Sequence, residues 1–317
     1  MHTLSRRHPI ALLLLAFTLA TATLALLLGC AEAQSSAPPS FNEVFVDLER
    51  FEALRAEGAA LIDAREAKAF KRAHIPGAYN TPWQLYVDGD KSGTISSDDK
   101  RLSAMLQKAG VRADKPVLIY GDWSAKSAWG EEGRVLWSLQ YLGKREVYVL
   151  QGGYKAWKQA QKADATEEVV KATVKVVAGD FVVARREELR ATTAEIAAAL
   201  EKDPSKIVLL DTREAIEYRG IPKYGEDRAG HIPGARHLWW YEVFESNGKL
   251  RSPEALRALF ASRGITHDTQ IVAYCTGGIR SGFIFAVLSS LGYTNIKNYD
   301  ASMWEWTAQA DTPVTRN

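Results

Sequence analysis

Cysteine is almost absent from this 317-residue chain, which contains two of them, Cys30 and Cys275. An excess of charge of one sign is absent as well, since 40 lysines and arginines balance 38 aspartates and glutamates. The net charge of +2 therefore gives no electrostatic reason to expect nucleic acid as a partner. What the chain does have is apolar residues, at 46%, and a length that suits two packed domains better than one.

The long apolar run of the chain lies at its start. Two arginines precede an almost wholly apolar stretch, a pattern that is typical of an export signal and assigns residues 1–30 to a leader. The stretch ends in Gly29-Cys30, which resembles the bacterial lipobox, where cleavage precedes a cysteine that is then acylated. We therefore expect lipidation of Cys30, a tether at residues 31–40, and an exported protein anchored to a bacterial membrane in the cell envelope, on the periplasmic side.

Two alternatives remain for the leader. One is ordinary signal cleavage after Ala31-Glu32-Ala33, and the other is a retained membrane anchor, since the apolar run is nearly long enough to span. All three interpretations place the rest of the chain in an oxidising compartment outside the cytoplasm. If Cys30 is lipidated or removed, Cys275 has no disulfide partner, and a lone exported thiol indicates a functional cysteine.

The remainder of the chain repeats itself. The stretch 61–80 recurs at 209–237, with Asp-x-Arg and His-Ile-Pro-Gly-Ala in both copies and a polar insertion in the second. Three more pairs follow in the same order: PVLIYG and QIVAYC (116–121, 270–275), GRVLWSLQYLG and GFIFAVLSSLG (133–143, 282–292), and GGYKAW and ASMWEW (152–157, 301–306). The duplication predicts one domain at 41–160 and another at 180–317, with a connector at 161–179.

Each half alternates short apolar runs with helical patterns. In the second half, we expect strands at 207–210, 270–274 and 296–299, and helices at 253–263 and 281–291. The alternation predicts an α/β fold in which each domain is a mainly parallel sheet flanked by helices. Functional groups in such sheets gather at the carboxyl ends of strands, which is where Cys275 is expected to lie.

Cys275 opens a six-residue loop that ends at Arg280. Gly277 and Gly278 permit backbone conformations that other residues avoid, so the loop can point successive N–H groups inward. The helix that follows adds partial positive charge to this anion-binding nest. A cysteine held there should have a depressed thiol pKa and act as a thiolate nucleophile.

Together, the repeated motifs and this loop resemble the tandem-domain rhodanese sulfurtransferases, over both halves from about residue 41 onward. The resemblance implies that Cys275 takes sulfane sulfur from a donor such as thiosulfate and passes it, as a persulfide, to a thiophilic acceptor such as cyanide or a thiol. The residues that would bind the substrate are Thr276, Gly277, Gly278, Ile279 and Arg280. We expect no metal, no cofactor and no nucleic-acid partner.

The donor remains open at this stage. Two-domain thiosulfate enzymes of the family have two basic residues after the cysteine, where this chain has Thr276 and Gly277. Mercaptopyruvate enzymes end the loop in a hydroxyl residue, where this chain has Arg280. An arginine of the family's first motif is replaced by Glu217, with Arg219 nearby. Transfer from 3-mercaptopyruvate or a thiol persulfide is one alternative, and a sulfur-binding or redox-sensing module without turnover is another.

Two comparisons of spacing narrow the activity. Cysteine phosphatases of the same general fold have five residues between cysteine and arginine, whereas four separate Cys275 from Arg280. The smaller loop suits a sulfur atom better than a phosphate, so phosphatase and arsenate reductase activities are not expected. The first half has Gly121 in place of the nucleophile and a loop five residues longer, so we expect it to be inactive and to form one wall of the cleft.

Several other residues have two interpretations. His74 and His231 recur in both halves, as do the Asp-x-Arg pairs, which favours structural roles over catalysis. Arg280 either contacts an anionic group of the donor or pairs at the loop rim with Glu305 or Asp300. Trp157, Trp306 and the run 239–241 are expected in the cores. The stretch 88–99 has the spacing of an EF-hand calcium loop, but a polar turn is the preferred interpretation.

Overall fold

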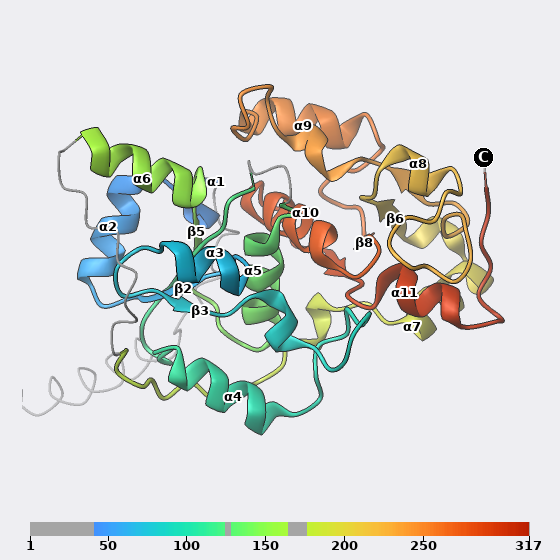
Figure 1. Cartoon of the computed structure of the whole chain (residues 1–317). Coiled ribbons are helices and arrows are strands. Elements are labelled where there is room, and N and C mark those ends of the chain that lie inside the picture. Colours follow the sequence, from blue (N-terminus) through green and yellow to red (C-terminus); the bar gives the residue numbers. More distant parts are fainter. Residues whose placement is uncertain (1–40, 124–127, 164–175, 317) are drawn as a thin grey trace, which may run out of the picture. The chain divides into compact units, whose positions relative to one another are not determined.

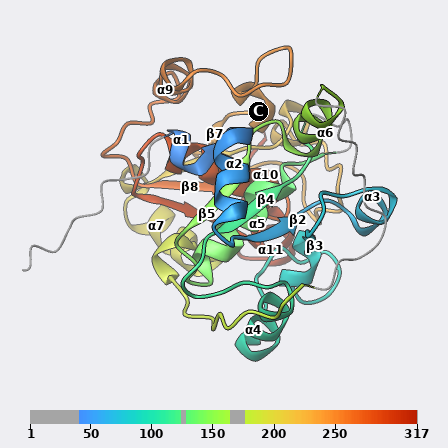
Figure 2. The same cartoon turned by 90° about the vertical axis from the view of Figure 1, so that its left-hand side faces the viewer.

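The structure, a computed structural model, describes residues 41–123, 128–163 and 176–316 (Figures 1 and 2). These residues belong to one compact unit. The expected leader with Cys30, the tether and most of the connector lie outside the described residues.

Helices and strands alternate along both halves. The first half consists of α1 (Phe41–Val44), β1 (Phe45–Val46), α2 (Leu48–Ala56), β2 (Ala60–Asp63), α3 (Ala67–Arg72), β3 (Tyr79–Asn80), η1 (Trp83–Tyr86), α4 (Asp99–Lys108), β4 (Val117–Tyr120), α5 (Glu131–Tyr141), β5 (Val147–Leu150) and α6 (Gly153–Ala163). The second half consists of η2 (Glu187–Leu189), α7 (Thr193–Lys202), η3 (Pro204–Lys206), β6 (Val208–Asp211), α8 (Ala215–Tyr218), β7 (Arg236–His237), η4 (Trp240–Val243), α9 (Pro253–Ala261), β8 (Ile271–Tyr274), α10 (Ile279–Ser290), β9 (Ile296–Asn298) and α11 (Ser302–Ala308).

Each half contains its own parallel sheet. The strand order is β1-β5-β4-β2-β3 in the first half and β7-β6-β8-β9 in the second, and all paired strands run parallel. The inner strands β4 and β8 are completely buried, because helices cover both faces of each sheet. The predicted α/β architecture with two parallel sheets is therefore confirmed.

The predicted elements of the second half are found within a few residues of their expected positions. Helix α9 begins as its sequence indicates, since the Ser252 hydroxyl accepts from the Ala255 N–H at 3.3 Å and Pro253 occupies the first turn. Helix α10 begins at Ile279, two residues earlier than predicted. The reason is Gly278, whose φ of 79° provides the left-handed residue that turns the chain into the helix.

Helices α5 and α10 pack against each other and join the two halves; they lie side by side in both views (Figures 1 and 2). Their close approach depends on a glycine from each helix. A Cβ on Gly282 would lie 2.8 Å from the Arg134 Cα, and a Cβ on Gly133 would overlap the Phe283 backbone. The first half is thereby held directly behind the loop of residues 275–280, which leads into α10.

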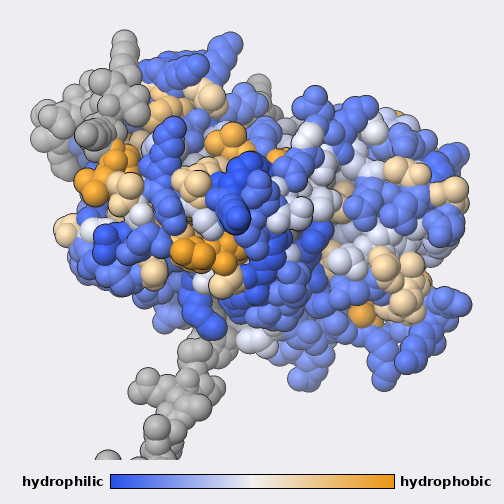
Figure 3. Space-filling view, turned by 90° about the horizontal axis from the view of Figure 1, so that it is seen from below, coloured by the Kyte–Doolittle hydropathy of each residue, from blue (hydrophilic) through white to orange (hydrophobic). Residues whose placement is uncertain are grey.

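The surface is mainly polar. Figure 3 shows a face that is mostly hydrophilic, with small separate apolar patches. Among the residues described, the large hydrophobic side chains that are exposed are Leu85, Val177, Val182, Ile221 and Trp239. None of the helices in this described part has the length and apolar character needed to cross a membrane.

Candidate active site

Cys275 directly follows β8 and lies at the carboxyl end of that strand, with 1% of its surface exposed. The segment that follows β9 contacts the Cys275 backbone. The Cys275 N–H donates to the Ser302 hydroxyl at 3.1 Å, and the Met303 N–H donates to the Cys275 carbonyl at 3.2 Å. Ser302 adopts a φ of 53°, which a serine seldom takes, and its hydroxyl donates to the Tyr299 carbonyl at 2.6 Å. These bonds fix the backbone of the nucleophile.

The Cys275 sulfur faces hydrogen-bond donors of its own loop. The Gly278 N–H donates to Sγ at 3.1 Å, and the Ser281 hydroxyl lies 3.8 Å from it. Burial raises the pKa of the Cys275 thiol, but the Arg280 charge and the N–H groups of the loop lower it by more, so the net shift is below its ordinary value. The loop therefore favours a thiolate, as its glycines predict.

The first residue after the nucleophile connects it to buried carboxylates. The Thr276 hydroxyl lies 3.0 Å from Glu217 Oε1 and 3.1 Å from Glu226 Oε1. Glu226 also receives the Tyr224 N–H at 2.9 Å and lies 3.6 Å from the Arg213 guanidinium. Burial raises the pKa of Glu226, but these N–H groups and Arg213 lower it by more, so this carboxylate is ionised near neutral pH.

Arg280 forms a bidentate ion pair with Glu217, at 2.6 and 2.9 Å, and is 3% exposed. The partners considered from the sequence are engaged elsewhere: Asp300 accepts from Arg190, and Glu305 from Thr193. Burial alone would lower the pKa of Arg280, yet its pKa is raised because Glu217 is so close. Arg280 therefore forms a salt bridge, but its partner is Glu217 and not Glu305 or Asp300.

Aromatic side chains from both halves surround this loop. The Arg280 guanidinium lies over the rings of Trp129 and Tyr224, at 5.4 and 5.3 Å from their centroids. A cavity of about 160 Å³ reaches the nucleophile, and its lining residues are Trp83, Trp129, Tyr224, Cys275, Thr276, Gly277, Ile279, Arg280 and Trp304. Four of the five predicted substrate-binding residues line it, and Gly278 instead contacts the sulfur. The first half supplies two of its walls, as expected.

Sequence reasoning missed the support that the first half gives the catalytic loop. Arg134 on α5 is fully buried and donates to the Gly277 carbonyl at 3.4 Å and to the Gly93 carbonyl. Burial lowers the pKa of Arg134 to about 10, so it remains charged near neutral pH. The Ile95 N–H donates to the Asp300 carboxylate at 2.8 Å. The only sequence signal was the position of Arg134 beside a repeated glycine.

The equivalent place in the first half holds a buried acid. Gly121 follows β4, as Cys275 follows β8, and a Cβ on Gly121 would overlap the Glu132 carboxylate. Neither oxygen of that carboxylate has a hydrogen-bond partner within the described residues. Burial raises the pKa of Glu132 to about 8. In the described part of this loop, Gly121 stands where the second half has its cysteine, in keeping with the prediction that the first half is inactive.

The residues shared by both halves are structural, as predicted. Arg65 pairs with Asp63 at 2.6 Å, and the corresponding pair in the second half, Arg213 and Asp211, has a separation of 2.7 Å. The two histidines contact backbone: His74 Nδ1 lies 2.9 Å from the Phe70 carbonyl, and His231 Nδ1 lies 2.8 Å from the Tyr218 carbonyl.

The remaining predictions have mixed outcomes. Trp157 and Trp306 are core residues, but of the run 239–241 only Trp240 is buried, and Trp239 is 40% exposed.

The two ends of the calcium-like stretch 88–99 bind arginines instead of converging on one site, since Asp88 pairs with Arg101 and Asp99 with Arg185. This favours the polar turn, whose inner part docks on the catalytic half.

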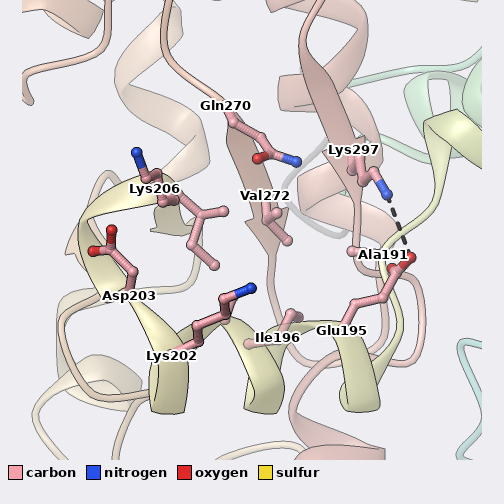
Figure 4. A pocket seen from close by; sticks show the side chains of 11 residues that line it. Ala191, Glu195, Ile196, Lys202, Asp203, Lys206, Gln270, Val272 and Lys297 are labelled. Carbon is pink, nitrogen blue, oxygen red and sulfur yellow. Dashed lines mark ion pairs between the residues drawn. The ribbon is translucent and has the colours of Figure 1, made fainter.

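A larger cavity of about 420 Å³ lies between α7 and the edge of the second sheet (Figure 4). Figure 4 shows Lys202, Lys206 and Lys297 around it, and Lys297 pairs with Glu195 at 3.5 Å. It contains neither a nucleophile nor any residue of the Cys275 loop. The smaller cavity is therefore the candidate active site.

Known proteins provide a separate comparison. The model of the rhodanese-like domain matches residues 47–160 and 192–309. The chain is 32% identical over 258 residues to the sulfur carrier protein TtuD of Thermus thermophilus, covering 78% of this chain and 87% of that protein. It is 29% identical over 272 residues to a thiosulfate sulfurtransferase of Corynebacterium glutamicum, covering 82% and 86%.

A solved structure agrees with the fold. The crystal structure of SseA from Escherichia coli, described as a 3-mercaptopyruvate sulfotransferase, superposes with a TM-score of 0.69 at 24% identity, covering 81% of this chain and 98% of that one. Two matches to the family model, relatives over most of the chain and a common fold lead to one conclusion: this chain belongs to the rhodanese family.

Proposed function

We propose that this chain is a sulfurtransferase that carries sulfane sulfur on Cys275, from a small-molecule donor to a thiophilic acceptor. The observation that carries the proposal is the position of the Cys275 sulfur, which is buried at a strand end and 3.1 Å from the Gly278 N–H that opens α10. A thiolate and the outer sulfur of a persulfide are both electron-rich, so the same N–H groups stabilise both.

The reaction has two displacement steps. In the first, the Cys275 thiolate attacks the transferable sulfur of the donor, and the leaving group takes the electron pair of the bond that breaks. That bond is S–S in thiosulfate or a persulfide, and C–S in 3-mercaptopyruvate. In the second, an acceptor nucleophile such as cyanide or a thiolate attacks the outer sulfur of the Cys275 persulfide and releases the thiolate. No external oxidant or reductant is needed, since the sulfane sulfur is transferred between nucleophiles.

The relatives support this chemistry but differ in donor. Their names describe a sulfur carrier, a thiosulfate sulfurtransferase and a 3-mercaptopyruvate enzyme. Transfer from thiosulfate, from 3-mercaptopyruvate or from a thiol persulfide would all use Cys275. A sulfur-binding or redox-sensing module without turnover would form the same persulfide and lack steady release to small acceptors.

The test is the mass of the protein before and after exposure to sulfane-sulfur donors. We expect a gain of about 32 Da, one sulfur atom, located on Cys275 by peptide mapping and removed by cyanide. A matched Cys275→Ser variant, with an unchanged melting temperature, should gain nothing and lose turnover. Turnover that persists in this variant would exclude Cys275 as the carrier.

We propose further that the protein is exported and lipid-anchored through Cys30. The support is the leader pattern of residues 1–30, which ends in Gly29-Cys30, together with the small, polar tether that follows it. Expression of the full chain in a bacterium should give a membrane-bound protein whose N-terminal peptide carries acyl mass on Cys30. The Cys30→Ser variant should lose that mass and leave the membrane fraction. An unmodified Cys30 in the full chain would contradict the lipid anchor.

A further inference from the structure

Among the described residues, the cavity that reaches Cys275 has one cationic lining residue, and that cation is already paired. Of the nine described residues around the cavity, Arg280 is the one cation, and both of its terminal nitrogens bind Glu217. We propose, on the basis of the sulfur-transfer function above, that the donor is an organic persulfide, R–S–SH, whose carbon part is flat, apolar and free of negative charge. Thiosulfate and 3-mercaptopyruvate each bring an anionic group that this cavity does not match.

The ion-pair network next to Thr276 is net negative, and Arg134 behind Gly277 adds one positive charge that balances it. The connected network around Thr276 contains three carboxylates and two guanidiniums: Asp211, Glu217, Glu226, Arg213 and Arg280. Its formal charge is therefore −1. An anionic group of a donor would lose its hydration on entering, and among the described residues the one cation that lines the cavity is already paired with Glu217. Desolvating a charge that gains no partner is costly.

The loop itself accommodates one negative charge, at the reacting sulfur. The Gly278 N–H already points at the Cys275 sulfur, and the Gly277 carbonyl is held from behind by Arg134. Thiosulfate carries its sulfonate next to the transferred sulfur, so a second charge would have to lie among the rings. An organic persulfide presents only carbon there.

The walls have the shape and chemistry for an apolar group. Trp83 and Trp129 come from the first half, and Tyr224 and Trp304 from the second. The Trp304 side chain is fixed by its indole N–H, which donates to the Tyr224 carbonyl at 2.9 Å, and the rings of Trp129 and Tyr224 meet edge to face at 5.2 Å. Preorganised aromatic walls bind a flat ring with little loss of side-chain entropy.

A nearby lysine does not change this conclusion. Lys91 reaches the backbone beside Tyr224, since a Cβ on Gly225 would lie 3.1 Å from its Nζ. Lys91 is exposed to solvent and is not among the residues that line the cavity. Its charge therefore belongs to the rim and not to the lining of the cavity.

Sulfur transfer from such a persulfide to Cys275 is a single displacement. The Cys275 thiolate attacks the outer sulfur of R–S–SH, the S–S bond of the donor breaks, and R–S⁻ leaves with the electron pair. The outer sulfur keeps its proton and remains on Cys275 as the persulfide, and the departing thiolate takes a proton from water.

The experiment compares two organic persulfides that differ in one carboxylate, with thiosulfate as a third donor. The reduced full chain is mixed with benzyl persulfide, 4-carboxybenzyl persulfide or thiosulfate, and the rate of sulfur loading on Cys275 is followed by mass. Each rate is divided by the rate of the same donor with free cysteine. We expect benzyl persulfide to load at least about tenfold faster than its carboxylated analogue, with thiosulfate slowest.

Two variants provide independent readouts. Glu217→Gln removes the partner of Arg280, so thiosulfate loading should rise severalfold relative to benzyl persulfide. Trp83→Leu removes an aromatic wall that the first half supplies, so benzyl persulfide loading should fall severalfold more than thiosulfate loading.

The outcomes separate this proposal from the one on which it rests. If the carboxylated donor or thiosulfate loads Cys275 of the native chain as fast as benzyl persulfide, the donor class is wrong while sulfur transfer stands. If none of the three donors loads Cys275, and 3-mercaptopyruvate does not load it either, the sulfurtransferase function itself fails. A Glu217→Gln variant that folds and gains nothing with thiosulfate would also overturn the proposed role of the ion pair.

Discussion

Arg280 acts on the nucleophile through its charge, and its geometry is set by a residue of another segment. Glu217 holds the guanidinium in a fixed plane, and the Trp129 and Tyr224 rings lie against it. The charge is close enough to Cys275 to oppose the effect of burial on the thiol pKa. Arg280 is therefore better described as an activator of the thiolate than as a receptor for the donor.

Replacement of Arg280 by methionine should raise the pKa of the Cys275 thiol. The pH midpoint of Cys275 alkylation by iodoacetamide should move to higher pH, because the opposing charge is gone while burial remains. Arg280→Lys should restore part of the shift. The control is Arg219→Met, because Arg219 is exposed just after α8 and does not line the cavity. An alkylation profile that is the same in Arg280→Met and the native chain would exclude this electrostatic role.

Glu132 should make the protein less stable as the pH rises. Its pKa is about 8 in the folded chain, above that of a glutamate in an unfolded chain. Between these two values the unfolded state releases a proton that the folded state keeps, so the free energy of unfolding falls by up to about 1.4 kcal/mol per pH unit. In Glu132→Gln this contribution should disappear. Urea unfolding at about pH 5.5 and pH 7.5 measures it, and equal pH dependence in both proteins would refute it.

At the scale of elements, α5 and α10 are central to the arrangement. Both are almost entirely buried, and each contributes a glycine to their contact. Such contacts let two backbones approach more closely than side chains would allow, so that Arg134 can reach over to the Gly277 carbonyl. The catalytic loop thus depends on a helix from the other half.

Enlarging the glycine in this contact should separate the helices. In Gly282→Ala, the new Cβ would lie 2.8 Å from the Arg134 Cα, which is backbone and has no room to move. We expect a loss of stability of about 1–3 kcal/mol, together with slower sulfur loading. Ser289→Ala, on the same helix, removes an atom instead of adding one and should change both far less. If the free energy of unfolding of Gly282→Ala equals that of the native chain, the two helices can move apart without cost and the prediction is wrong.

At the scale of the whole molecule, the half without a nucleophile still takes part in the chemistry. It supplies Trp83 and Trp129 to the cavity and Arg134 behind the loop, and its turn near Ile95 binds Asp300. The first half thus has a parallel sheet like that of the second half, with Gly121 in place of Cys275, and it provides aromatic walls and a buried charge beside the Cys275 loop.

Arg134 should be a positioning residue for the catalytic loop. In Arg134→Met, the buried charge and the bond to the Gly277 carbonyl are lost, so the alkylation midpoint of Cys275 should rise and sulfur loading should slow. Arg134→Lys retains the charge and should recover part of the shift, which a purely structural role would not predict. Arg145→Met, on the exposed surface of the same half, serves as the control. If the pH profile of Cys275 alkylation is the same in Arg134→Met and the native chain, Arg134 contributes to packing alone.

Local patterns in the sequence were enough to predict the duplication, the alternating strands and helices, and the position of Cys275 after β8. Apolar runs, helix caps and turn glycines depend on residues close in the chain, so they can be read without knowing the fold. The helix start at Ile279 differed by two residues because a left-handed Gly278 extends the helix backward. The structural roles of His74 and His231 followed from their recurrence in both halves.

Only the tertiary structure determined which charges and rings meet at the nucleophile. Glu217 and Arg280 are 63 positions apart, and Trp83 and Trp304 belong to different halves, so no local pattern links them. Their meeting depends on helix packing across the two sheets, which is long-range by nature. The sequence by itself therefore identified Cys275 as the proposed nucleophile and predicted the fold that presents it. Only the tertiary structure showed that Arg280 is already paired with Glu217. The donor class that we propose for the cavity follows from this pairing.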